Sequence, residues 1–370
     1  MMPEAVVRTE TVSPGRWASR AATAAIACGV LAFALGVAGD RSRATLASLA
    51  ACWLFFAGLS AGSLAVVAAV RLARGRWAGP ILPIAEATAG CLACAVIPLI
   101  ALLAGARVLL PWAASAGTTG LALLSARQLV PTAALVAAGA RLVATGRPGR
   151  RAGATAAAVA YLLAYVVALS FWAYDWVLSL SSAPPPAVLP ALYFVGALLS
   201  GLAWIALVAA ARGVGEAGLR HDLGKLLFGL VAFWAYLLWA IYLAAWYGGV
   251  PAEVAPLLAR WAGPYRPVTV CVLASVFVWP FSLLLAERTK RRRVTLLAGA
   301  GAILLGLLAE RFLLVLPSLA LGGDALTLLA GAGTALGVAG LFALGVSRRL
   351  APAPSAWETG VARTAPPADP

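Results

Sequence analysis

Charged residues are scarce in this sequence. They make up 11% of the 370 residues, against about 25% in an ordinary soluble domain, while 63% are hydrophobic and the mean hydropathy is +0.94. This composition excludes a soluble protein and predicts an integral membrane protein. The formal net charge of +15 comes largely from basic residues that stand between apolar segments. Such a pattern is typical of membrane orientation and gives no reason to expect a nucleic-acid partner.

Residues that bind metals or cofactors are also few. The single histidine, His221, cannot supply the paired axial ligands that a haem in the membrane needs. Cys91 and Cys94 form a C-x-x-C, but a metal site would need a second pair or nearby histidines. We interpret the pair as packed, inert thiols. The sequence also contains no phosphate-binding loop and no nucleophile triad. We therefore expect no metal or other cofactor in this chain and no catalysis by it alone.

Long apolar runs are what the sequence has in abundance. A helix crosses a bilayer with about 20 apolar residues, and backbone groups in lipid are satisfied only in helices or closed barrels. These runs do not alternate as barrel strands do, so we expect an all-α integral membrane fold. About ten transmembrane helices are predicted near residues 20–39, 44–70, 79–105, 119–140, 153–181, 187–211, 224–247, 267–287, 294–316 and 325–347.

The ends of the chain differ from this membrane domain, which we place at 20–347. Residues 1–19 are polar and residues 348–370 are rich in proline, so both segments are expected to be disordered. With the N-terminus inside, the inner segments hold 21 of the 28 basic residues and the outer ones hold 5. Because basic residues accumulate on the cytoplasmic side, this count predicts ten spans with both termini cytoplasmic.

Ionisable residues within the predicted helices are costly in lipid, which makes each one a candidate for function. Glu86, Asp175 and Glu310 are candidates for a proton path, because burial favours a carboxyl group that can exchange a proton. The alternative for each acid is a structural, hydrogen-bonded role. Arg127 needs a carboxylate partner. Glu310 and Arg311 are adjacent and point about 100° apart, so we expect each to pair with another helix rather than with its neighbour.

The segment 221–247 combines polar residues with aromatic rings. Asp222 is expected to cap the N-terminus of the seventh helix on the cytoplasmic side. Further along, Trp239, Tyr242 and Trp246 are spaced three and four residues apart, which places three polar-tipped rings on one face. This spacing favours helix packing, with a cofactor or ligand surface as the alternative.

A resemblance to a known family rests on these residues. The runs Asp-Leu-Gly-Lys-Leu-Leu-Phe at 222–228 and Phe-Trp-Ala-Tyr at 233–236 resemble the ActF subunit of alternative complex III. Tyr-Asp-Trp-Val-Leu-Ser-Leu at 174–180 and Trp-Pro-Phe at 279–281 are similar to the same family. After this stretch family members commonly have Glu-Pro-His-Trp, whereas this chain has Ser-Ser-Ala-Pro at 181–184. The resemblance extends over about residues 45–320.

The resemblance implies a membrane subunit of a quinol:cytochrome c oxidoreductase, or of an enzyme with another periplasmic acceptor, in the bacterial cytoplasmic (inner) membrane. It implies the fold of the NrfD and polysulfide-reductase membrane subunits, with two four-helix bundles, helices two to five and six to nine, plus a peripheral pair. Haem c and iron–sulfur clusters would lie in partner subunits, namely multihaem cytochromes c and an iron–sulfur protein, beside an NrfD-like sister membrane subunit that is the better candidate for the quinol site. Quinone would be the ligand closest to this chain. Its candidate structural or quinone-proximal residues are Trp176, His221, Asp222, Lys225, Tyr236, Trp239, Tyr242 and Arg311.

Two other functions stay open at the level of sequence. A secondary transporter or proton-conducting carrier would be built from inverted repeats with broken helices at corresponding positions. Pro98 and Pro131 interrupt two predicted helices, but they do not form such a pair. A purely structural membrane subunit is the remaining alternative, in which the intramembrane acids pair locally.

Overall fold

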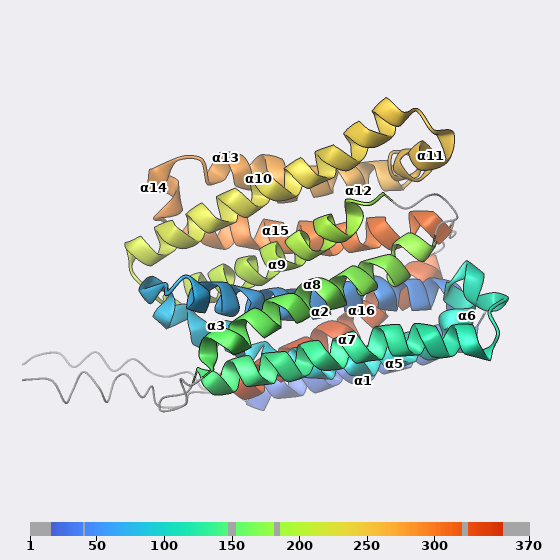
Figure 1. Cartoon of the computed structure of the whole chain (residues 1–370), viewed down its shortest axis with the longest axis horizontal. Helices are drawn as coiled ribbons and strands as arrows, with labels where there is room; N and C mark the ends of the chain where they lie inside the picture. The colour runs from blue at the N-terminus through green and yellow to red at the C-terminus, as the bar shows by residue number, and fades with distance from the viewer. Residues whose placement is uncertain (1–15, 40, 147–152, 181–185, 320–324, 351–370) are drawn as a thin grey trace, which may run out of the picture.

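The structure of the chain is a computed structural model that describes residues 16–39, 41–146, 153–180, 186–319 and 325–350 (Figure 1). Over these residues it is helical, without a strand. Ten stretches of the described chain are long and apolar enough to cross a membrane, which confirms an all-α, multi-span membrane protein. The central α2, for example, has 31 residues, whereas about 20 residues are enough for a helix to cross the 30 Å hydrocarbon core of a bilayer.

The elements have the following bounds. The first half of the chain contains α1 (Arg16–Ala38), α2 (Ser42–Leu72), η1 (Arg76–Ile81), α3 (Leu82–Ala87), α4 (Ala89–Cys94), α5 (Val96–Ala104), α6 (Ala106–Leu109), η2 (Pro111–Ala114), α7 (Thr118–Thr145), α8 (Ala154–Trp176) and η3 (Leu178–Leu180). The second half contains α9 (Leu189–Arg212), α10 (Ala217–Gly248), α11 (Pro251–Arg260), α12 (Tyr265–Val272), η4 (Leu273–Val278), α13 (Trp279–Leu283), α14 (Glu287–Lys290), α15 (Arg293–Val315), η5 (Pro317–Leu319) and α16 (Ala325–Leu350).

The helices form two bundles joined through α2 and α9. In the first bundle α2 packs against α8 and against the short segments α3 to α6, and α7 packs against α8. In the second bundle α9 packs against α10 and α15, and α15 packs against α12, η4 and α13. The remaining helices, α1 and α16, pack together; both contact α2, and α16 also contacts α4 (Figure 1). The predicted arrangement of two four-helix bundles and a peripheral pair is therefore confirmed.

Small residues allow the two bundles to approach closely at their junction. A Cβ atom added to Gly62 on α2 would lie 1.9 Å from the carbonyl oxygen of Ala197 on α9. A Cβ atom on Gly201 would lie 2.2 Å from the backbone nitrogen of Ser63. Close backbone approach at glycine is a common means of helix association in lipid, where burial of apolar surface gives no preference for one helix over another.

The ends of several helices differ from the prediction. Residues 16–19 and 348–350, predicted to be disordered, are helical, since a helix can continue past its apolar run into the interfacial region of a bilayer. The rest of the two predicted disordered segments lies outside the described residues. The helix α10 begins at Ala217, so it starts seven residues before the predicted boundary at 224.

The eighth span is not a regular α-helix. Its middle part, η4, forms a π-helical turn between α12 and α13. Ser275 and Val276 in this turn lie against Gly306 of α15, where an added Cβ atom would come within 2.3 Å of the Ser275 hydroxyl. Wide turns of this kind are frequent near functional sites. Here the turn contributes Leu273 and Phe277 to the wall of a cavity.

Candidate functional site

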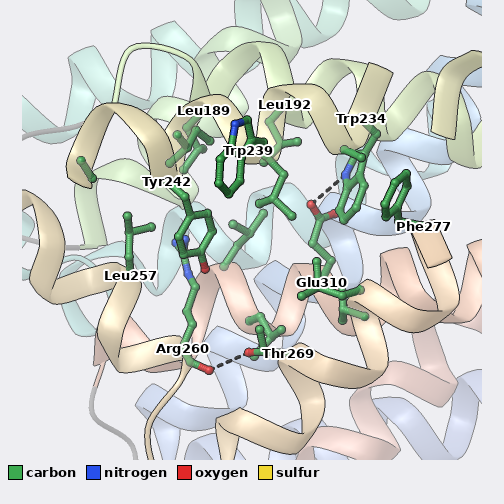
Figure 2. A pocket seen from close by; sticks show the side chains of 18 of the residues that line it. Leu189, Leu192, Trp234, Trp239, Tyr242, Leu257, Arg260, Thr269, Phe277 and Glu310 are labelled. Atoms are coloured by element: carbon green, nitrogen blue, oxygen red, sulfur yellow. Dashed lines mark hydrogen bonds between the residues drawn. The ribbon is translucent and has the colours of Figure 1, made fainter. Parts of the chain in front are cut away.

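A cavity of about 940 Å³ lies in the second bundle. Its walls come from α9, α10, α11, α12, η4, α13 and α15 (Figure 2). The aromatic and polar residues in its walls include Trp234, Tyr236, Trp239, Tyr242, Trp246, Arg260, Thr269 and Glu310. Most of the lining is apolar, so the cavity is suited to an amphiphilic molecule with a small polar part.

The aromatic face of α10 forms the mouth of this cavity. Tyr236, Trp239 and Trp246 line it and are 63%, 56% and 78% exposed. The prediction that the stripe of rings serves helix packing is wrong for Trp239 and Trp246 within the described structure, because no described helix covers them. Since Tyr236 and Trp239 lie within a helix long and apolar enough to span a membrane, the opening lies at membrane depth. Rings with a polar tip at this position favour the alternative, a ligand surface.

Glu310 of α15 provides an acidic group in the wall of the cavity. Its side chain is buried, and its Oε1 accepts a hydrogen bond of 3.2 Å from the indole nitrogen of Trp234 (Figure 2). Its Oε2 is also buried and has no hydrogen-bond partner within the described residues. A buried acceptor without a hydrogen bond is costly, so a small movement of the side chain that brings this oxygen to the cavity surface would let a ligand donor satisfy it.

Arg311 lies next to this acid but faces the interior of the protein. Its Nη1 is 3.3 Å from Oε2 of Glu310, so the prediction that the two adjacent residues do not pair with each other is wrong. The contact does not meet hydrogen-bond geometry, and Nη1 and Nε of Arg311 have no hydrogen-bond partner among the described residues. The guanidinium instead lies over the ring of Tyr193 on α9, 4.5 Å from its centroid. This cation–π contact and the Glu310 charge stabilise the buried cation.

Arg260 marks the end of the cavity near α11, and sequence reasoning placed it only among the outer basic residues. Thr269 donates a hydrogen bond of 2.6 Å to the Arg260 carbonyl oxygen, and Trp261 donates one of 3.1 Å to the Tyr242 hydroxyl. Burial lowers the pKa of the Arg260 guanidinium, and Tyr242 and Glu310 offset part of that shift. An arginine keeps its charge under such conditions.

A signal for Arg260 was present in the sequence. Val254, Leu257 and Leu258 have the spacing of one helical face, which indicates a short amphipathic helix that packs on the bundle. The last residue of that helix is Arg260, so its side chain could have been expected near the bundle rather than in a free loop.

Asp175 belongs to a different, closed network in the first bundle. Both of its carboxylate oxygens accept hydrogen bonds from Arg127 of α7, and Gln128 donates another. The indole nitrogen of Trp176 donates to the Gln128 side-chain oxygen at 3.0 Å. The predicted carboxylate partner of Arg127 is therefore Asp175. Because every polar atom of this acid has a partner, the geometry favours its structural role over a proton path.

Glu86 forms the third acidic site, at the other end of the membrane. Its Oε1 lies 2.5 Å from Nη2 of Arg71 at the end of α2, and Arg71 also donates to the Leu142 carbonyl oxygen. This pair ties α2 to α3 and α7 on the side of the basic loops. Glu86, Asp175 and Glu310 thus lie on different pairs of helices, and the described contacts do not join them into one path.

His221, Asp222 and Lys225 lie at the start of α10, far from its aromatic face. The predicted N-cap at Asp222 is wrong, because the helix begins at Ala217 and Asp222 lies within it. Asp222 is instead 3.7 Å from the Lys225 ammonium. The cavity begins on α10 at residue 232, so at 1.5 Å per residue Lys225 is about 10 Å away along the axis.

His221 contributes to a contact between this end of α10 and α14. Its Nε2 lies 3.9 Å from Oε1 of Glu287, which also accepts a hydrogen bond of 2.8 Å from Arg291. The Arg291 guanidinium lowers the pKa of Glu287, with a smaller effect from His221. These contacts hold the ends of two spans together at the surface and form no cavity.

Metal-binding groups do not gather in the part of the chain that the structure describes: no three His, Cys, Asp or Glu side chains lie close enough to hold an ion. The sequence matches no model of a known protein family, and it matches no curated protein. The candidate site is therefore defined by its own geometry, with Glu310, Tyr236, Trp239 and Tyr242 brought together as predicted residues and Arg260 added to them.

Proposed function

We propose that this chain is a membrane subunit of a quinol-oxidising respiratory complex and that its cavity takes up a membrane quinol. The observation that carries the proposal is the cavity of about 940 Å³ that opens to the bilayer beside a buried carboxylate oxygen without a hydrogen-bond partner. A quinol combines a flat ring, hydroxyl donors and a long apolar chain. Each of these parts has a counterpart in the wall.

The dimensions support such a ligand. On α10 the cavity extends from Ala232 to Trp246, which corresponds to about 21 Å along the helix axis. That is roughly two-thirds of the 30 Å hydrocarbon core, enough for a ring and several isoprene units. The volume also lies within the range of small-molecule sites, about 300–1,000 Å³. Trp239 and Tyr242 offer rings against which the head group can stack.

The chemistry assigned to this chain is proton transfer. Oxidation of a quinol to a quinone releases two protons and two electrons. In the proposal Glu310 accepts the two hydroxyl protons one after the other, releasing the first before it takes up the second, and the two electrons would pass to the iron–sulfur and haem c groups of partner subunits. Tyr242 and Arg260 hold the other oxygen of the ring by donating hydrogen bonds. A positioned carboxylate in a site shielded from water is an effective general base.

The resemblance to the ActF subunit of alternative complex III supports the same assignment and supplies the partners: an NrfD-like sister subunit, an iron–sulfur subunit and multihaem cytochromes c in a bacterial cytoplasmic membrane. The departure from the family pattern at 181–184 follows α8, in the first bundle. The cavity belongs to the second bundle, so that departure does not remove a residue that the proposal uses. A quinol site in this chain would be additional to the one that the resemblance favours in the sister subunit.

Purification in mild detergent tests membership of the complex. We expect the tagged chain to co-purify with haem-staining cytochrome c, an iron–sulfur protein and a second polytopic subunit, and the assembly to oxidise a short-chain quinol. Mass spectrometry and a haem stain identify the partners. A chain that purifies alone and without haem would contradict the proposal and favour the transporter alternative.

Trp239→Ala tests the cavity as the place where quinol binds. Loss of a stacking ring is expected to raise KM for the short-chain quinol about threefold to tenfold while kcat is kept, because one aromatic contact contributes about 0.5–1.5 kcal/mol. The matched control is Trp279→Ala on α13, which is 47% exposed but does not line the cavity. Equal KM values for the two variants would place quinol binding elsewhere.

A further inference from the structure

A second cavity lies behind the first and reaches the surface formed by the loops at the α11 end. Its volume is about 270 Å³. Pro186, Glu253 and Ser318 line it at the ends of helices or in connections, and Pro186 and Glu253 are exposed. Its lining is more polar than that of the first cavity, which favours occupation by water.

The two cavities share one wall. Leu189, Ile241, Ala245, Leu257 and Arg260 line both of them. Among the described residues, Arg260 is the only charged one in this shared wall, with Glu310 on the side of the first cavity and Glu253 on the side of the second. Glu310 raises the pKa of the Arg260 guanidinium, against the larger opposite effect of burial.

We propose that Arg260 is a gate between the two cavities, and that the second cavity is a water route by which Glu310 exchanges protons with the surface at the α11 end. The use of this route by quinol protons rests on the proposed function, whereas the route itself rests on the shared wall. The α11 end is opposite to the strongly basic loops, so the positive-inside rule places it on the outer side of the membrane.

The charge of Arg260 sets the height of the barrier between the two cavities. Glu310 releases its proton to water on its own side of the shared wall and becomes a carboxylate, which the guanidinium stabilises. A fixed positive charge repels a proton that approaches from either side, as an arginine in a narrow passage does in other membrane pores. The contact with Tyr242 keeps the side chain at the shared wall. Arg260 therefore controls the rate of proton exchange and not its direction.

Substituted cysteines test the route without relying on redox activity. Single cysteines are introduced as Ser318→Cys in the second cavity and Leu313→Cys in the first, in a chain that carries Cys28→Ala, Cys94→Ala and Cys271→Ala. A membrane-impermeant, positively charged thiol reagent is added to right-side-out spheroplasts. We expect Ser318→Cys to react quickly and Leu313→Cys slowly. Adding Arg260→Ala should speed the reaction of Leu313→Cys at least about tenfold, because the charged barrier is gone.

Leu305→Cys is the matched control, since Leu305 lies on the same helix but is 71% exposed outside both cavities. It should stay unreactive with either residue at 260. Arg260→Lys keeps a positive charge in the passage, so it should accelerate the reaction of Leu313→Cys only a little. This variant separates loss of the charged gate from a general loosening of the helix packing. An unchanged rate for Leu313→Cys in Arg260→Ala would overturn the gate. Reaction of Ser318→Cys only in inverted vesicles would overturn the outward direction, and neither result would bear on whether the complex oxidises quinol.

Discussion

Glu310→Gln lowers quinol-dependent turnover of the assembled complex by at least about 100-fold, if the carboxylate is the proton acceptor of the cavity. Glutamine has nearly the same shape and keeps an oxygen for the Trp234 indole, which now donates to Glu310 at 3.2 Å. It cannot take up the proton that a quinol hydroxyl must lose. The measurement is steady-state oxidation of a short-chain quinol by the purified complex, together with proton release recorded by a pH indicator.

The matched control for this variant is Glu287→Gln at the start of α14. This acid is 65% exposed at the opposite end of the bundle and contacts only His221 and Arg291 in the described structure. The complex that carries Glu287→Gln should turn over quinol at the rate of the native complex. If Glu310→Gln assembles fully and also turns over at the native rate, the purely structural alternative holds and the proton path through Glu310 is refuted.

The second large effect concerns stability and is expected at the Arg127–Asp175 pair. Arg127→Met leaves the fully buried Asp175 with Gln128 as its remaining side-chain donor, and loss of one partner of a buried pair costs about 3–5 kcal/mol. Asp175→Asn should cost less, about 1.5–3 kcal/mol, because asparagine still accepts from Gln128. The side chain of Arg127 is 28% exposed, so in that variant its charge can turn away from the protein. Unfolding in mixed micelles with increasing detergent denaturant measures both.

The order of these two costs is the informative quantity. Arg141→Met on the same helix is the control, since Arg141 is exposed near the end of α7, and it should change stability little. Equal costs for Arg127→Met and Asp175→Asn would show that the charge of Asp175 is not what the network stabilises. Near-native turnover in Asp175→Asn would support the structural role that the closed network favours.

The fold could be predicted from the sequence because lipid leaves a segment few options. Each apolar run had to be a helix, and the alternation of basic loops set the number of spans. The break of the eighth span into α12, a π-helical turn and α13 could not be predicted, because it depends on the contact of Ser275 with Gly306 on another helix. The start of α10 at Ala217 was missed since the helix extends beyond its apolar run.

The candidate site was only partly accessible to the same reasoning. Glu310 stood out as an acid at membrane depth, and the spacing of Trp239 and Tyr242 placed their rings on one face. Whether that face meets a helix or a cavity depends on how far α12 stands from α10, which sequence periodicity does not determine. Arg260 was missed because an arginine after a short helix looks like any other loop cation. Its position in the shared wall follows only from the packing of α11 on the bundle.

The sideways opening of the large cavity also determines how a ligand arrives. Tyr236 and Trp239 place the mouth within a span, so a ligand enters from the plane of the bilayer. The rate at which the ligand meets the cavity then depends on its mole fraction among the lipids and on two-dimensional diffusion, rather than on its total concentration in the sample. An inhibitor of this site would lose apparent potency as phospholipid is added at constant protein, because the added lipid dilutes it in the phase onto which the mouth opens.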